Sequence, residues 1–93
     1  AVIESVTTHA WGAIYEQEFA EASRLLDEAD RLIRLGGHDD STLRAQWWLA
    51  RAESLRASSD YDRRLAALDA AIALYERLAP RDPNLAIALA NSA

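Results

Sequence analysis

The side chains best suited to chemistry gather in one short stretch, GGHDD, at residues 36–40. It places one imidazole, His38, beside two carboxylates, Asp39 and Asp40. Imidazole and carboxylate are ordinary ligands of divalent metals, so a metal site is one interpretation of this loop. The other is a solvated loop in which Asp40 caps the next helix. We favour the second, because a metal site needs more ligands than one short loop supplies. We therefore predict neither a metal nor a cofactor.

The other chemistry-bearing residues form no recognisable catalytic group. His9 has Glu4 and Glu16 in its neighbourhood, but nothing nearby in the sequence makes it the base of a nucleophile. The chain has no cysteine and no lysine, which excludes thiol catalysis, cysteine-based metal sites and Schiff-base chemistry. RLGG at 34–37 closes a helix rather than opening one, so it is no phosphate loop. We predict that the protein is not an enzyme.

Composition and charge narrow the partners. The chain has 93 residues, of which 51% are hydrophobic, and this is enough for one small folded domain. Its net charge of −5 argues against nucleic acid and against an anionic membrane surface. No apolar run approaches the length of about 18 residues that spans a bilayer, and no signal peptide is visible. The absence of cysteine suits the cytoplasm. Because the chain begins without Met and ends on the apolar run LAIALANSA, we expect it to be a fragment of a longer protein.

The elements that must position these residues are predicted to be helices, so the fold class is all-α. Ala, Leu, Arg and Glu dominate the chain, and apolar residues recur at helical spacing between a few breakers. We predict helices over 2–15, 19–35, 42–57 and 61–79, with a last one beginning near Pro83. An alternative is one long helix over 8–35 in a three-helix bundle, since no strong breaker separates the first two segments.

The helix ends carry expected caps. Gly36 ends the helix over 19–35, and Asp40 or Ser41 caps the one that follows. Ser59 and Asp62 match a capping box before the helix over 61–79, which Pro80 then ends. We expect each helix to begin or end at these residues.

The chain resembles itself after a shift of 42 residues. Phe19 then falls on Tyr61, Leu26 on Leu68, and GGHDDS on LAPRDP. Matches at apolar positions of one helix face indicate a structural repeat, and such units stack into a solenoid. We predict one domain over 1–93, made of repeat 1 (1–42), repeat 2 (43–84) and a partial repeat 3 (85–93).

Residues 59–93 resemble a tetratricopeptide repeat, in particular the variety of about 42 residues found in kinesin light chains and bacterial signalling proteins. The resemblance is carried by Tyr61 in the short loop, by Ala71 where paired helices cross, and by the proline link PRDP. The first copy departs from the pattern, since 15–21 lacks the family's glycine turn and GGHDDST replaces the proline link. The resemblance implies antiparallel helical hairpins stacked as a short α-solenoid.

The resemblance also implies a concave groove that grips peptides. The family pattern places in it Glu4, Thr7, Trp11, Ile14 and Tyr15 of the first copy, Gln46, Leu49, Glu53 and Arg56 of the second, and Asn91 of the third. Our candidate peptide groove comprises Trp11, Tyr15, Gln46, Leu49, Glu53 and Arg56. We expect it to hold an apolar or aromatic anchor, with Arg56 for a carboxylate. The alternative is that Trp11 and Tyr15 only cover an unpaired terminal face.

Two functions follow as hypotheses. The first is a non-catalytic protein-protein interaction scaffold, part of a larger bacterial signalling or regulatory protein, with a protein or peptide partner. The second is self-association into a homo-oligomer through the apolar edge at 85–93.

The adjacent Trp47 and Trp48 bear on how the helices pack. Neighbours on a helix point about 100° apart, so one buried face cannot hold both rings. A solenoid helix is packed on two sides. We therefore expect Trp48 to fill the core of its own hairpin, and Trp47 to face the preceding helix near Leu32 or Ile33.

Overall fold

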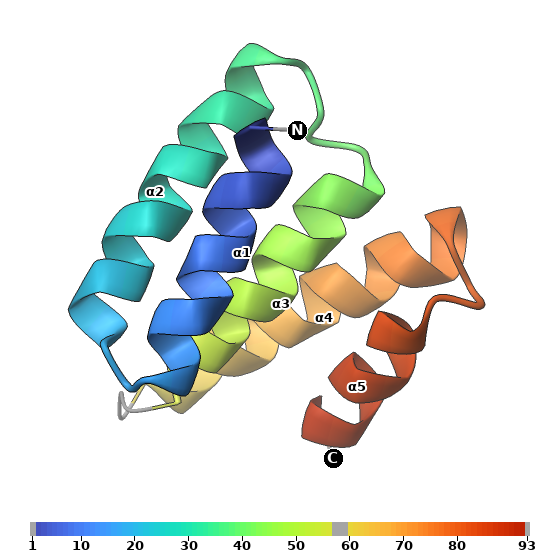
Figure 1. Cartoon of the computed structure of the whole chain (residues 1–93). Helices are drawn as coiled ribbons and strands as arrows, with labels where there is room; N and C mark the ends of the chain where they lie inside the picture. Colours follow the sequence, from blue (N-terminus) through green and yellow to red (C-terminus); the bar gives the residue numbers. More distant parts are fainter. Residues whose placement is uncertain (1, 57–59, 93) are drawn as a thin grey trace.

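The computed structural model describes residues 2–56 and 60–92 and folds them into helices without any strand (Figure 1). The all-α class is therefore confirmed. None of these helices is both long enough and apolar enough to cross a membrane. The helices are α1 (Val2–Tyr15), α2 (Phe19–Leu35), α3 (Thr42–Ser54), α4 (Tyr61–Leu78) and α5 (Pro83–Ser92).

A tight turn separates α1 from α2, so the single helix over 8–35 is wrong. Gln17 has a φ of 61° and is the only non-glycine residue with positive φ in the described ranges. Its N–H donates to the Ile14 carbonyl over 3.0 Å, and the N–H of Glu18 donates to the Ala13 carbonyl over 2.8 Å. These two bonds form a Schellman motif, which normally uses glycine at the left-handed position. Glutamine stands at that position here, so the glycine that usually marks such a turn is missing, although the helices predicted over 2–15 and 19–35 leave room for it.

The end of α2 repeats this geometry with the expected residue type. Gly37 has a φ of 71°, and its N–H donates to the Arg34 carbonyl over 3.2 Å. The N–H of His38 donates to the Ile33 carbonyl over 2.9 Å. Gly36 is the C-cap, as predicted, and the glycine after it supplies the left-handed turn.

Ser41 rather than Asp40 caps α3. The Ser41 backbone is extended, and its hydroxyl accepts a hydrogen bond from the N–H of Arg44 over 3.3 Å. Asp40 instead pairs with Arg77 of α4, so its assignment as a cap is wrong. Asp40 lies one residue before the cap, and its carboxylate reaches the Arg77 guanidinium on α4.

The ends of the remaining helices agree with the proline positions. Pro80 follows the C-cap of α4, and α5 begins at Pro83. The side chain of Asp60 caps α4 by accepting from the N–H of Arg63 over 3.2 Å. The predicted cap Ser59 lies outside the described residues. The helix predicted over 42–57 ends at Ser54, and residue 57 likewise lies outside them.

Two apolar clusters form the core, and α3 contributes to both. In the packing, α1 lies on α2, α3 lies on α4 and against both α1 and α2, and α5 lies on α4. The first cluster joins α1, α2 and α3 and contains Ala10, Ala13, Ile14, Ala22, Leu26, Ala29, Ile33, Trp47 and Ala50. The second joins α3, α4 and α5 through Leu49, Leu68, Tyr75, Leu85 and Ala88.

The two adjacent tryptophans confirm that α3 is packed on two sides. Trp47 is 8% exposed and lies in the first cluster, as predicted, and its indole N–H donates to the Leu26 carbonyl of α2 over 2.7 Å. The prediction for Trp48 needs correction. Its ring is half-buried and packs against both clusters, while Leu49 is the large α3 side chain buried in the second. The two indole rings meet edge to face, with centroids 4.8 Å apart.

Candidate functional site

An open cleft of about 840 Å³ lies between α1, α3 and α5. Helix α5 folds back after α4 and forms one of its walls (Figure 1). The walls are largely apolar and comprise Trp11, Ile14, Tyr15, Phe19, Leu49 and Ile87. A concave apolar surface with a few polar groups is the usual form of a binding site.

Two aromatic side chains of α1 stand in this cleft. Trp11 and Tyr15 are four residues apart, and their ring centroids are 6.1 Å apart at a tilt of 33°. Trp11 is half-buried and packs against both core clusters. Tyr15 is 81% exposed, so its ring offers contact area that the fold does not use.

The floor of the cleft carries a buried carboxylate. Glu53 is only 6% exposed. Its Oε1 accepts a hydrogen bond from Asn91 Nδ2 over 2.7 Å, and its Oε2 accepts from Arg56 Nη1 over 3.0 Å. A buried charge is tolerated only with such partners. Asn91 thereby ties α5 to α3, and Arg56 is held in an ion pair rather than left open for a ligand's carboxylate.

The structure brings most of the predicted groove together. Trp11, Tyr15, Leu49, Glu53 and Arg56 line the cleft, as do Ile14 and Asn91 from the wider prediction. Gln46 lies elsewhere, in an adjoining pocket of about 270 Å³ that also contains Glu4 and Thr7. Trp11 and Leu49 border both spaces.

Sequence reasoning missed four residues of the cleft. Gln17 lies in the turn between α1 and α2, and Phe19 is the first residue of α2; neither was among the residues predicted for the groove. Asn84 and Ile87 lie seven and four residues before Asn91, on the same face of α5. That spacing is the signal that could have found them.

The adjoining pocket borders a buried hydroxyl without a partner. Tyr75 is fully buried, and no described residue makes a hydrogen bond to its hydroxyl oxygen. Burial raises the pKa of Tyr75 to about 12, and the negative charge of Asp82 adds to the rise, while the nearby Asn84 amide acts weakly in the opposite direction.

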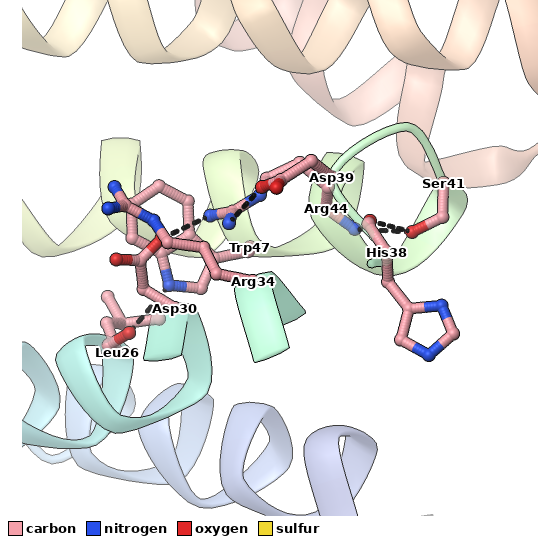
Figure 2. Close-up of polar contacts among 8 residues, drawn as sticks. All are labelled: Leu26, Asp30, Arg34, His38, Asp39, Ser41, Arg44 and Trp47. Atoms are coloured by element: carbon pink, nitrogen blue, oxygen red, sulfur yellow. Dashed lines mark hydrogen bonds and ion pairs between the residues drawn. The ribbon is translucent and has the colours of Figure 1, made fainter. Parts of the chain in front are cut away.

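A buried arginine near the start of α3 makes polar contacts with α2 and with the loop at 36–41 (Figure 2). Arg44 is 5% exposed, and its guanidinium donates to Asp30 Oδ1 over 2.8 Å and to Asp39 Oδ1 over 2.7 Å. The guanidinium carbon lies 4.7 Å from the centroid of the Trp47 ring. This network fastens α2 and the loop at 36–41 to α3, which gives Asp39 a structural role.

The loop at 36–41 does not assemble its three candidate ligands. Figure 2 shows the His38 imidazole pointing away from Asp39, and Asp40 is paired with Arg77. Within residues 2–56 and 60–92, no group of three or more histidine, aspartate and glutamate side chains is placed to share a metal ion.

Comparison of the chain with protein-family models, with curated proteins and with solved structures finds no match. The function is therefore argued from the geometry of the cleft.

Proposed function

We propose that the protein is a non-catalytic interaction module that binds a segment of another protein in the cleft between α1, α3 and α5. The observation that carries this proposal is the uncovered apolar surface of the cleft. Tyr15 is 81% and Ile87 47% exposed, above a floor at Leu49 that is 2% exposed. Apolar surface in water is unfavourable by about 25 cal/mol per Å², so a partner that covers these side chains gains free energy.

The same proposal includes the way the helices stack. We infer a short solenoid of the tetratricopeptide type, in which α1 with α2 and α3 with α4 form successive hairpins. Three observations support it. First, α2 and α4 begin 42 residues apart, at Phe19 and Tyr61. Second, side chains of α3 belong to both apolar clusters, so α3 joins the two hairpins. Third, residues of α1, α3 and α5 all line the cleft. This stacking gives the cleft the concave form that a peptide needs.

The test compares two exposed tyrosines. Tyr15 lies in the cleft, and Tyr61, which is 61% exposed, lies at the start of α4 away from it. Peptides selected on the wild-type protein from a random display library are titrated against Tyr15→Ala and Tyr61→Ala by calorimetry. Because an interface aromatic commonly contributes about 1 to 2 kcal/mol, we expect Tyr15→Ala to weaken binding roughly 5- to 30-fold. Tyr61→Ala should bind like the wild type.

Equal affinities for the two variants would show that the cleft is not the binding surface. A library that yields no binder would count against the function itself. Thermal unfolding of both variants serves as the control, and it should change little because both rings are exposed.

A second candidate is self-association through α5. Ile87 and Leu89 on this helix are 47% and 49% exposed, so a second copy of the chain that covered them would remove apolar surface from water. Light scattering over a range of concentrations separates the two functions. If the protein is a monomer at high concentration, self-association is contradicted, whereas the proposal of a peptide-binding cleft still stands.

A further inference from the structure

We infer that the partner segment inserts a cationic side chain, arginine or lysine, into the cleft, where the buried carboxylate of Glu53 binds it. The inference rests on the proposed function and specifies the chemistry of the partner. The sequence led to the opposite expectation, namely that Arg56 binds a carboxylate of the partner.

The fixed charge of the cleft is negative. Glu53 is 6% exposed and is held in place by Asn91, so its carboxylate keeps its position whether or not a partner is bound. Among the described residues, each oxygen of this carboxylate accepts one hydrogen bond, Oε1 from Asn91 Nδ2 and Oε2 from Arg56 Nη1. An ionised carboxylate offers about four acceptor sites, so it has capacity for a further donor.

The positive charge beside it can be exchanged. The Arg56 side chain is 64% exposed and follows α3, three residues after its ion-pair partner. The pair joins an exposed arginine to a buried carboxylate, so a cation of the partner can replace Arg56 without leaving the carboxylate unpaired. Arg56 therefore occupies, from within the chain, the place that an incoming guanidinium or ammonium group would take.

The surroundings of Glu53 suit a cation as well. Trp11 and Tyr15 line the same cleft, and aromatic faces attract guanidinium and ammonium groups. The stem of an arginine or lysine is apolar and fits the walls formed by Ile14 and Ile87. The net charge of −5 draws basic segments toward the protein and repels acidic ones.

The experiment uses an array of synthetic 12-residue peptides in matched triplets. The three members of a triplet are identical except for a central arginine, leucine or glutamate. They are probed with the wild type, Glu53→Gln, Arg56→Ala and the control Arg24→Ala, and the best triplets are then titrated by calorimetry. Arg24 is a matched control because it is also an exposed arginine, 63% exposed, paired with a glutamate three residues away, and it lies on α2 outside the cleft.

We expect the wild type to bind the arginine member about 10-fold more tightly than the leucine member, the usual effect of one charge-assisted hydrogen bond. The glutamate member should bind most weakly. Glu53→Gln should remove this preference and leave the leucine member unchanged. Arg56→Ala should tighten binding of the arginine member about 3- to 10-fold, because it removes the competing cation and leaves the carboxylate in place. Arg24→Ala, which loses the same charge elsewhere, should not sharpen the preference.

Opposite results overturn the inference. The inference is wrong if Arg56→Ala weakens binding of the glutamate member, or if the wild type prefers that member. In either case Arg56 binds a carboxylate of the partner, and the cleft selects acidic rather than basic side chains. If Glu53→Gln does not fold, Arg56→Ala still tests the inference. Tighter binding of the arginine member supports it, and weaker binding of the glutamate member contradicts it. Tyr15→Ala is titrated with the same triplets. A triplet that shows no charge preference but binds Tyr15→Ala more weakly than the wild type refutes this inference alone. Triplets insensitive to Tyr15→Ala refute the proposed function.

Discussion

Replacing Trp47 by alanine should destabilise the protein more than replacing its neighbour Trp48. Trp47 is 8% exposed and completes the cluster between α1 and α2, whereas Trp48 is half-buried between the two clusters. The sequence predicts Trp48 as the ring that fills the core of its hairpin, whereas the structure buries Trp47 more deeply.

The magnitude follows from three losses at Trp47. Removing a buried tryptophan side chain costs about 3 to 5 kcal/mol of the free energy of unfolding. The hydrogen bond from the indole to the Leu26 carbonyl, 2.7 Å long, contributes about 1 kcal/mol, and the contact with the Arg44 guanidinium about 0.5 to 1 kcal/mol. Together these give an expected loss of about 4.5 to 7 kcal/mol for Trp47→Ala. For the half-buried ring of Trp48 we expect about 2 kcal/mol.

Urea unfolding followed by far-ultraviolet circular dichroism measures both free energies. Since small domains are stable by roughly 5 to 15 kcal/mol, Trp47→Ala should unfold at a much lower urea concentration. Trp47→Phe is the matched variant, because it keeps a ring in the cluster but loses the indole N–H. It should cost about 1 to 2 kcal/mol. Equal losses for Trp47→Ala and Trp48→Ala, or no loss for Trp47→Phe, would refute this account of the packing.

Three further predictions concern single positions. Because Gln17 has a φ of 61°, Gln17→Gly should raise the free energy of unfolding by about 0.5 to 1 kcal/mol, whereas Gly37→Gln at the matching position, with a φ of 71°, should lower it by about 1 kcal/mol; opposite signs in urea unfolding check this. Arg44→Ala should cost about 2 kcal/mol, because Arg44 is buried between two carboxylates, and Arg34→Ala, whose side chain is 71% exposed, should cost less than about 0.5 kcal/mol; similar losses would contradict the network. The pKa of Tyr75 is raised from 10.0 to about 12. The stabilisation by its neutral hydroxyl is therefore complete below pH 10, and about 2 to 3 kcal/mol of the free energy of unfolding is lost as the pH rises to about 12. Unfolding measured from about pH 8 to about pH 12 should show this loss in the wild type and a smaller one in Tyr75→Phe.

The cleft shows how far a sequence can place a site. Trp11 and Tyr15 lie together in the cleft because both are on one helix at a spacing of four residues, and Leu49 and Glu53 line it from α3. The resemblance to the tetratricopeptide repeat implied the same grouping. The ion pair between Glu53 and Arg56 was not foreseen. The two residues are three apart, so the pair itself is local. Only the assembled helices bury the Glu53 carboxylate, which is 6% exposed.

The turn at Gln17 has a geometry that the residue type at this position does not indicate. A Schellman motif can be recognised in the sequence where glycine stands at the left-handed position, as at Gly37. At Gln17 the chain adopts the same turn without that signal, because the packing of α1 on α2 outweighs the local cost of about 1 kcal/mol.

The sequence by itself determined the helices, most of their ends and the residues on each apolar stripe. Caps such as Ser41 and starts such as Pro83 act through bonds within one turn, and a stripe repeats every three to four residues, so both are local. Only the tertiary structure decided which of Trp47 and Trp48 is buried, where Asp40 finds its partner, and that a negative charge occupies the floor of the cleft. Each of these depends on the rotation of a helix between neighbours on both sides. A step of about 100° per residue makes that rotation decisive, and it is set by contacts between residues far apart in the chain.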